Sequence, residues 1–176
     1  MDARINIKIF LKTVILFPLF MIFIMFPLCL LIVITAFVPN GRVLATKLYE
    51  FFGWIGIVLV GVELNVIGAE KIDTKKSYVV IGNHPSTLDI FTHITALPVS
   101  IRFLTKTELF RIPIFGRVLK TLGLPRIDRK NAKANFEKIN DSINQVIKLG
   151  NSIMIFPEGK RSNQKELLPF KKGAAY

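Results

Sequence analysis

The sequence predicts an α/β fold in which an N-terminal membrane-associated helical hairpin over residues 1–62 precedes a mixed sheet flanked by helices over residues 63–176. Two observations lead to this prediction. No charged residue occurs from Thr13 to Val38, and a second apolar stretch follows from Leu48 to Val62. From Glu63 onward, short apolar runs of strand length alternate with helix-like segments, which is typical of a largely parallel or mixed sheet.

The composition sets this chain apart from an ordinary soluble domain. Of its 176 residues, 51% are hydrophobic, and the formal net charge is +12. Basic and apolar character together indicate an anionic membrane surface as a partner, since each Lys or Arg near such a surface gains about 1 kcal/mol. Nucleic acid would explain the charge but not the apolar N-terminus, so we expect no nucleic-acid partner. The single cysteine, Cys29, cannot form an internal disulfide.

The charge-free run from Thr13 to Val38 is long enough to cross a bilayer, because a helix of this length extends roughly 35–40 Å. It is too long for the core of a cleaved signal peptide and lacks a small-residue cleavage site, so we expect a retained anchor. Pro18 and Pro27 each remove a helix hydrogen bond and predict kinks.

Two arrangements of this hairpin fit the sequence: it crosses the bilayer, or it lies shallowly in one leaflet. The aromatic residues of the second stretch favour the interface. In either arrangement the following domain stays on the face of the basic N-terminus, which the positive-inside rule makes cytoplasmic. A hairpin buried in a soluble core is the remaining alternative, and the length of the charge-free run argues against it.

The second domain is expected to contain five strands and three helices. The expected strands are Glu63–Ile67, Tyr78–Gly82, Ile101–Leu104, Leu124–Ile127 and Ser152–Phe156. The expected helices are Ser86–Leu97, Ile114–Leu122 and Asn131–Leu149, the last with one apolar face and with Gly150 placed to end it. Ligands of open α/β sheets bind beyond the carboxyl ends of the strands, so polar residues at those ends are expected to meet.

The polar segment after the strand Tyr78–Gly82 contains His84 and, five residues later, Asp89. Pro85 disfavours helical geometry at His84 and Ser86 is a good N-cap, so the chain is expected to turn and bring the Asp89 carboxylate to one ring nitrogen. The other nitrogen could then take a proton, as a general base does. The same residues also fit a capping box, in which Asp89 only satisfies backbone N–H groups. The sequence does not decide between these two readings.

No nucleophilic side chain stands out. Ser86 lacks a G-x-S-x-G context, and Cys29 lies in the hairpin. We therefore expect a direct transfer, in which His84 deprotonates an acceptor hydroxyl that attacks the donor without a covalent enzyme intermediate. His93, two turns into the same predicted helix, is interpreted as a structural histidine.

Positive charge also gathers near the ends of the predicted strands. The turn from Glu158 to Ser162 follows the last strand; its glycine permits a tight turn, and Arg161 can present a planar fork to phosphate oxygens. Lys106, Arg126 and Arg129 lie near the ends of other strands. Each is more often a surface charge when taken singly, but together they fit a phosphorylated substrate.

In this order and spacing, the motifs resemble those of the membrane-bound glycerolipid acyltransferases, closest to the 1-acyl-sn-glycerol-3-phosphate (lysophosphatidic acid) acyltransferases. The N-H-x-x-x-x-D motif is met by Asn83, His84 and Asp89. The G-x-x-x-I-D-R motif is met by Gly123, Ile127, Asp128 and Arg129. The F-P-E-G-T-R-S motif is met by Phe156, Pro157, Glu158, Gly159, Arg161 and Ser162. Lys106 resembles the family lysine that precedes a P-x-x-G element, here Pro113 to Gly116.

The resemblance implies a glycerolipid-acyltransferase-like sheet in which His84 is the general base and Asp89 its orienting partner. It implies that the phosphate and glycerol of a lysophospholipid are bound by Lys106, Arg129, Glu158, Gly159 and Arg161. The acyl donor would be acyl-CoA or acyl carrier protein, with no metal and no organic cofactor. The reaction would convert lysophosphatidic acid to phosphatidic acid in phospholipid biosynthesis, at the cytoplasmic face of the membrane.

The chain departs from the family pattern in two places. Lys160 stands where the family usually has threonine, which adds a cation and could shift the head-group preference. The chain stops at Tyr176, before the family's fourth motif, so we expect a truncated domain with an incomplete sheet, whose activity and stability a C-terminal extension would raise. The alternatives are the same chemistry on glycerol-3-phosphate or another lysolipid, and a non-catalytic basic membrane adaptor, which would leave the ordered motifs unexplained.

Overall fold

The computed structural model describes residues 14–15, 17–128, 134–162 and 167–171. Its N-terminal part is helical. The first apolar run forms α2 (Phe17–Phe20), the π-helical turn η2 (Met21–Met25), α3 (Phe26–Ile34) and the 3₁₀ turn η3 (Thr35–Phe37). The second helix, α4 (Gly41–Val60), packs against α3, so the predicted hairpin is present. α4 begins at Gly41, before the predicted apolar stretch that starts at Leu48. Its first turns can include Arg42 and Lys47 because these two side chains are exposed, while Ala45 and Tyr49 are buried.

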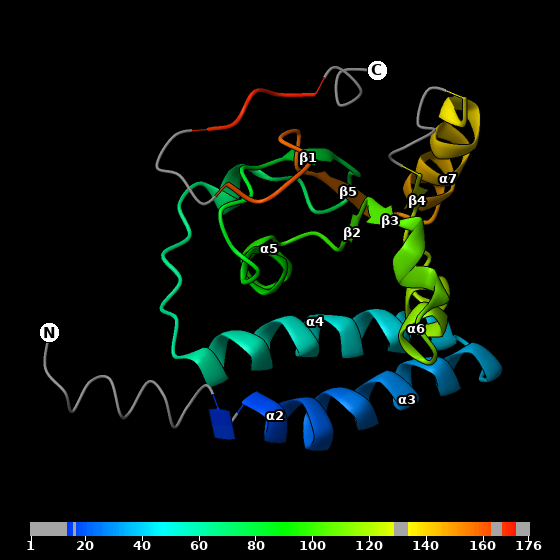
Figure 1. Ribbon diagram of the computed structural model, residues 1–176. Helices are drawn as coiled ribbons and strands as arrows, with labels where there is room; N and C mark the ends of the chain where they lie inside the picture. Colours follow the sequence, from blue (N-terminus) through cyan, green and yellow to red (C-terminus); the bar gives the residue numbers. More distant parts are fainter. Residues whose placement is uncertain (1–13, 16, 129–133, 163–166, 172–176) are drawn as a thin grey trace, which may run out of the picture.

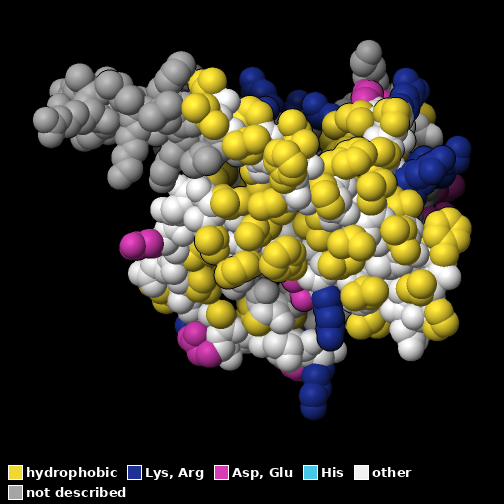
Figure 2. Space-filling model, turned by 90° about the horizontal axis from the view of Figure 1, so that it is seen from below, with side chains coloured by type: hydrophobic (Ala, Val, Ile, Leu, Met, Phe, Trp, Pro, Cys, Tyr) yellow, Lys and Arg dark blue, Asp and Glu magenta, His cyan; other side chains and the backbone are white. Residues whose placement is uncertain are grey.

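The hairpin exposes most of its apolar surface. The stretches Pro18–Phe37 and Gly41–Val60 are each 20 residues long and apolar enough to cross a membrane, and only 24% and 28% of their most apolar windows are buried. Figure 2 shows hydrophobic side chains covering the face of the molecule formed by these helices, with Lys and Arg at its rim. Such exposure contradicts a hairpin buried in a soluble core.

The second domain alternates strands and helices, as predicted. After η4 (Ala69–Lys71) come β1 (Val79–Ile81), α5 (Asp89–Ala96), β2 (Ile101–Phe103), β3 (Thr105–Lys106), η5 (Thr107–Arg111), α6 (Phe115–Thr121), β4 (Arg126–Ile127), α7 (Phe136–Lys148) and β5 (Ser152–Ile155). The described strands form a sheet in the order β1-β5-β2 and a pair β3-β4, and every pairing is parallel. Parallel pairing places the carboxyl ends of β1 and β5 side by side, where the His84 and Glu158 segments begin.

α5 lies between the sheet and α4 (Figure 1), and close packing fixes α4 against it. A Cβ atom added at Gly53 would lie 2.4 Å from Cγ2 of Ile94, and one added at Gly56 would lie 2.1 Å from Cδ1 of Phe91. Only glycine allows an approach this close. The apolar hairpin is therefore held against the α/β domain where Gly53 and Gly56 of α4 meet α5.

Three expected elements differ from the structure. Glu63–Ile67 forms no strand, because no described strand pairs with it and Ile67 is 87% exposed, so no burial fixes an extended pleat. The helix expected from Ser86 begins at Asp89, for reasons given below. The expected strand Leu124–Ile127 is shortened to β4, since Pro125 has no N–H to pair. The start of the helix expected at Asn131 lies outside the described residues, and Gly150, at φ 75°, follows the end of α7 as predicted.

Candidate active site

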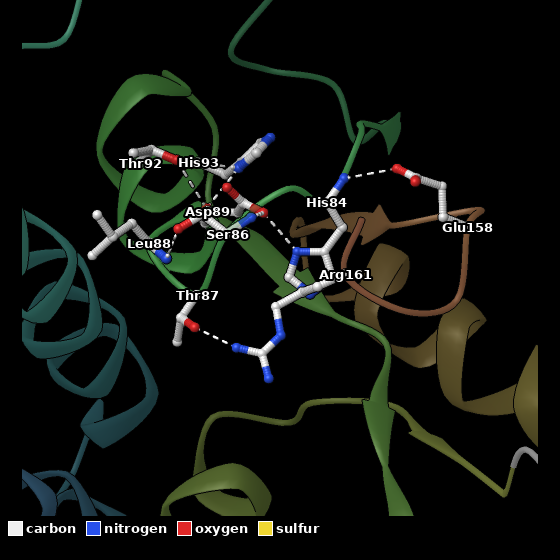
Figure 3. A network of polar contacts seen from close by, with 9 residues as sticks. All are labelled: His84, Ser86, Thr87, Leu88, Asp89, Thr92, His93, Glu158 and Arg161. Atoms are coloured by element: carbon white, nitrogen blue, oxygen red, sulfur yellow. Dashed lines mark hydrogen bonds and ion pairs between the residues drawn. The ribbon is translucent and has the colours of Figure 1, made fainter. Parts of the chain in front are cut away.

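His84 and Asp89 meet as their spacing predicts. The chain leaves β1 and turns before α5, and Nδ1 of His84 lies 2.6 Å from Oδ2 of Asp89 (Figure 3). A carboxylate only accepts, so Nδ1 carries the proton in this pair and Nε2 is the ring nitrogen that can accept one. The Asp89 side chain is nearly buried and that of His84 is partly exposed, so the carboxylate is the more enclosed partner of the pair.

Asp89 also accepts a backbone hydrogen bond, as the capping interpretation predicts, but this is not its only contact. The same Oδ2 atom accepts a hydrogen bond from the backbone N–H of Ser86 at 2.9 Å, and Oγ of Ser86 accepts one from the N–H of Leu88 at 3.1 Å. These contacts satisfy N–H groups that precede the helix, so regular helical bonding starts only at Asp89. One carboxylate thus fixes both the helix start and the histidine ring, and the two readings of the sequence describe one arrangement.

The imidazole of His84 is held by an aromatic stack. The ring of Phe156, which follows β5, lies parallel to it with centroids 4.1 Å apart and an interplanar angle of 10°. Phe156 is itself packed against Phe103 and against the edge of His93. Nδ1 of His93 donates to the carbonyl of Asp89 at 2.6 Å, so this second histidine serves the helix and the packing, as expected.

Glu158 links the two strand ends. Its Oε1 accepts the backbone N–H of His84 at 3.0 Å, and its Oε2 accepts the N–H of Leu168 at 3.1 Å. These two donors, first that of His84, lower the pKa of this carboxyl below its ordinary value, so it is ionised at neutral pH. The side chain is only 2% exposed. Its contacts favour a positioning role over the direct contact with substrate that the resemblance implies.

Arg161 lies beside the same loop. Its Nη1 donates to Oγ1 of Thr87, which places the guanidinium, exposed at its end, next to the His84–Asp89 segment (Figure 3). The turn that brings it there needs Gly159, whose φ is 70°, a left-handed conformation that side chains rarely adopt. The backbone N–H of Ser162 also donates to the carbonyl of His84 at 3.0 Å, so the cationic turn and the base are joined directly.

The other predicted substrate-binding residues are less fully placed. Lys106 is exposed on β3, in register with Ile127 of β4, and the described structure gives no contact between it and the His84 loop. Arg129 lies outside the described residues. Within the described ranges, no group of three or more His, Cys, Asp or Glu side chains is arranged to hold a metal ion.

Comparison with known proteins shows the family of the chain. The sequence profile described as Acyltransferase matches residues 63–176, the whole α/β part of the chain. The chain belongs to the Acyltransferase family. The matched range includes the His84–Asp89 pair and the Glu158–Arg161 turn.

Several named relatives are similar to this chain. A 1-acyl-sn-glycerol-3-phosphate acyltransferase of Cocos nucifera is 35% identical over 136 residues, which are 77% of this chain and 44% of the relative. One of Saccharomyces cerevisiae is 35% identical over 119 residues, 66% of this chain and 39% of the relative. The chain thus spans less than half the length of these relatives. The crystal structure of the 1-acyl-sn-glycerophosphate (LPA) acyltransferase of Thermotoga maritima has the same fold, with a TM-score of 0.70 at 23% identity over 99% of this chain and 69% of that one.

Two features of this acyltransferase site were not predicted from the sequence. The stacking of Phe156 on His84 had a weak signal, since an aromatic residue directly follows an apolar strand and precedes the polar turn. The bond from the His84 N–H to Glu158 joins residues 74 positions apart, and no local pattern indicates it. Both contacts depend on the parallel pairing of β1 with β5.

Proposed function

We propose that this protein transfers an acyl group from acyl-CoA or acyl carrier protein to the free hydroxyl of lysophosphatidic acid, giving phosphatidic acid. The observation that carries the proposal is the 2.6 Å contact between Nδ1 of His84 and the Asp89 carboxylate, which fixes one ring nitrogen as a donor and leaves Nε2 as a base. The family membership and the names of the relatives support acyl transfer to a lysophospholipid.

The reaction follows from this pair. Nε2 of His84 takes the proton of the acceptor hydroxyl as the oxygen attacks the thioester carbonyl, and the Asp89 carboxylate stabilises the imidazolium that forms. When the carbon–sulfur bond breaks, the imidazolium returns the proton to the leaving thiolate. General-base help of this kind contributes about 10²–10⁴ in rate. The stack with Phe156 and the Glu158 contact to the His84 backbone hold the base in place for that step.

The acceptor phosphate is proposed to bind at the cationic turn. Arg161 already lies beside Thr87, so a phosphate next to its guanidinium would place the glycerol hydroxyls of the same molecule near His84. Lys106 and Arg129 are proposed as further phosphate contacts, and Lys160 as an additional cation that affects the choice of head group.

The protein is further proposed to rest on the cytoplasmic face of a membrane with its hairpin lying shallowly in one leaflet. α4 contacts α5 so closely at Gly53 and Gly56 that it cannot cross a bilayer without drawing the α/β domain in with it. The opposite face of the hairpin is apolar and exposed (Figure 2). This position would let the site take a lipid acceptor directly from the leaflet.

Acyl transfer to competing acceptors tests the choice of substrate. The full-length protein in membranes is given one labelled donor, either acyl-CoA or acyl carrier protein, together with lysophosphatidic acid, glycerol-3-phosphate and a lysophosphatidylcholine. We expect phosphatidic acid as the main product, because the other two acceptors lack either the acyl chain or the exposed phosphate monoester. A main product from glycerol-3-phosphate would overturn the proposed acceptor while keeping the chemistry, and binding without any acyl transfer would favour a membrane adaptor.

A further inference from the structure

A large cavity lies away from the His84 loop. Its volume is about 1050 Å³, and it is formed by the first turns of α4, the end of α6, the segment leading into β4, and α7. Its described lining contains no residue from the His84–Asp89 segment or from the Glu158–Arg161 turn, and it includes Gly123 and Asp128 of the G-x-x-x-I-D-R segment. The volume suits an organic ligand of moderate size. The basic side chains that line it are Arg42, Lys47, Arg102, Lys120, Arg126 and Lys138.

The charge of this cavity is strongly positive. The acidic side chains in its described lining are Glu50 and Asp128, so the six cations and two carboxylates of the described lining have a net charge of +4. A concave site lined by one sign of charge concentrates ions of the opposite sign. The cavity is therefore suited to a ligand that carries negative charge.

Arg102 forms the most unusual part of the lining, because this charged side chain is only 2% exposed. The side chain extends from β2, and its Nε donates to the carbonyl of Leu122 at 2.7 Å. Its Nη1 donates to Oγ of Ser100 at 2.8 Å and to the carbonyl of Ile101 at 3.0 Å. Its Nη2 donates to Oγ1 of Thr46 at 2.7 Å. All these acceptors are neutral. Among the residues that the structure describes, no carboxylate forms an ion pair with it.

Two consequences follow for the Arg102 guanidinium. It has five N–H donors, and the four hydrogen bonds to described residues leave one Nη2 hydrogen available. Burial lowers the pKa of this guanidinium, and the neighbouring Tyr49 and Glu50 offset part of that effect. A buried cation is expensive unless an anion compensates it, so an anionic group in the cavity would stabilise the site.

The position of the cavity indicates the source of that anion. Val43 lines it and is 60% exposed, and it belongs to the same helix, α4, that forms part of the exposed apolar face. Lys and Arg side chains gather at the rim of that face (Figure 2). A ligand with a charged head and apolar chains could therefore place its head in the cavity and its chains along the hairpin.

The two faces of β2 separate this cavity from the catalytic pair. Arg102 pairs with Ile153 and Phe103 with Met154, and successive side chains of a strand point to opposite faces. Phe103 packs on Phe156, the ring that stacks on His84, so Arg102 points to the other face. The thioester of an acyl donor has to lie next to His84, so this cavity on the other face of β2 is unsuited to the reacting end of the donor. A lipid headgroup that only anchors the protein does not need to lie next to His84.

We propose that this cavity is a second phosphate-binding site, which holds the headgroup of an anionic phospholipid taken from the membrane surface on which the hairpin lies. The site would tie the enzyme to anionic leaflets and set its orientation on them. This proposed headgroup site depends on the proposed function only in one respect, the position on a membrane that supplies the lipid. It does not depend on the proposed proton transfer at His84.

Charge reversal at two exposed lining lysines tests the site. Binding of short-chain phosphatidylglycerol, which is neither proposed substrate nor product, is measured by calorimetry on the full-length protein in neutral micelles. The test variant is Lys120→Glu/Lys138→Glu. The matched control is Arg117→Glu/Lys148→Glu, which changes the charge equally on the same helices α6 and α7 at exposed positions outside the described lining. Thermal unfolding checks that both variants fold, and acyl transfer in the same preparations reports separately on the proposed function.

We expect the lining variant to bind phosphatidylglycerol at least about 30-fold more weakly, because each cation near an anionic lipid gains about 1 kcal/mol. The control variant should bind as the unmodified protein does, and added CoA or inorganic phosphate should not displace the lipid. Equal weakening in both variants would reduce the effect to general surface charge and overturn the proposal. Displacement by CoA would also overturn it, by assigning the cavity to a soluble phosphate ligand.

Discussion

Replacing Asp89 by asparagine tests how the catalytic pair works. In the structure a single oxygen, Oδ2, accepts hydrogen bonds from Nδ1 of His84 at 2.6 Å and from the N–H of Ser86 at 2.9 Å. A hydrogen bond to a charged group contributes about 1.5–3 kcal/mol and one between neutral groups about 0.5–1.5 kcal/mol, so converting two such bonds should cost about 2–3 kcal/mol of folding stability. The larger effect should fall on kcat, because the imidazolium formed during proton transfer loses its neighbouring charge.

Steady-state acyl transfer measures this effect. We expect Asp89→Asn to lower kcat by about 10²–10⁴ while leaving KM for the acceptor nearly unchanged, since the carboxylate is nearly buried and both of its hydrogen bonds are made within the protein. Thr92→Val is the matched control on the same helix, because Oγ1 of Thr92 donates to the backbone carbonyl of Asp89 and not to its carboxylate. Its kcat should stay near that of the unmodified protein. An unchanged kcat in Asp89→Asn, with the fold intact, would refute the role of Asp89 in orienting the base.

Three further predictions concern folding and membrane attachment. Backbone donors lower the pKa of Glu158, so its contribution to stability is complete above the ordinary glutamate pKa of 4.5 and is lost as the pH falls through the lowered pKa. Glu158→Gln should therefore flatten the acidic part of a plot of melting temperature against pH. An unaltered plot would contradict the stabilising role of the ionised carboxylate. Gly56→Ala should cost about 1–3 kcal/mol of stability by overpacking against Phe91, and Phe91→Leu should recover part of it; an unchanged melting temperature would argue against the close packing of α4 on α5. Phe23→Glu, at a side chain 70% exposed on the hairpin, should release the protein from phosphatidylcholine vesicles in sedimentation, whereas Ile67→Glu, 87% exposed outside the hairpin, should not; equal release by both would count against the apolar face as the anchor.

The sequence predicted the elements whose signals are local and whose environment is buried. The runs that form β1, β2 and β5 are apolar and bounded by turn residues, so their places were clear. Glu63–Ile67 has a similar pattern, but a strand also needs a partner and a covered face, and a local pattern carries neither. The predicted helix start, Ser86, lies three residues before the observed start at Asp89. The backbone N–H groups of Ser86 and Leu88 donate to the side chains of Asp89 and Ser86, so these residues form a turn that precedes the helix.

The candidate site was predictable in its residues and only partly in its geometry. The segment from His84 to Asp89, with Pro85 between them, left two interpretations open, a contact of Asp89 with His84 or with backbone N–H groups, and the structure contains both contacts. The burial of Glu158 and its bond to the His84 backbone depend on the register of β1 against β5, which the sequence does not state. Arg102 carried one signal, a lone charge inside an apolar strand, whose meaning appears only when the cavity beside it is seen.

The central claim is that His84 is the base of an acyl-transfer reaction. The most direct measurement compares acyl transfer from labelled acyl-CoA or acyl carrier protein to lysophosphatidic acid by membranes that contain the full-length protein, its His84→Ala variant or its His93→Ala variant. We expect His84→Ala to lower the rate by about 10²–10⁴ or more without loss of membrane binding, and His93→Ala to have a much smaller effect. Acyl transfer that survives in His84→Ala at the unmodified rate would contradict the account.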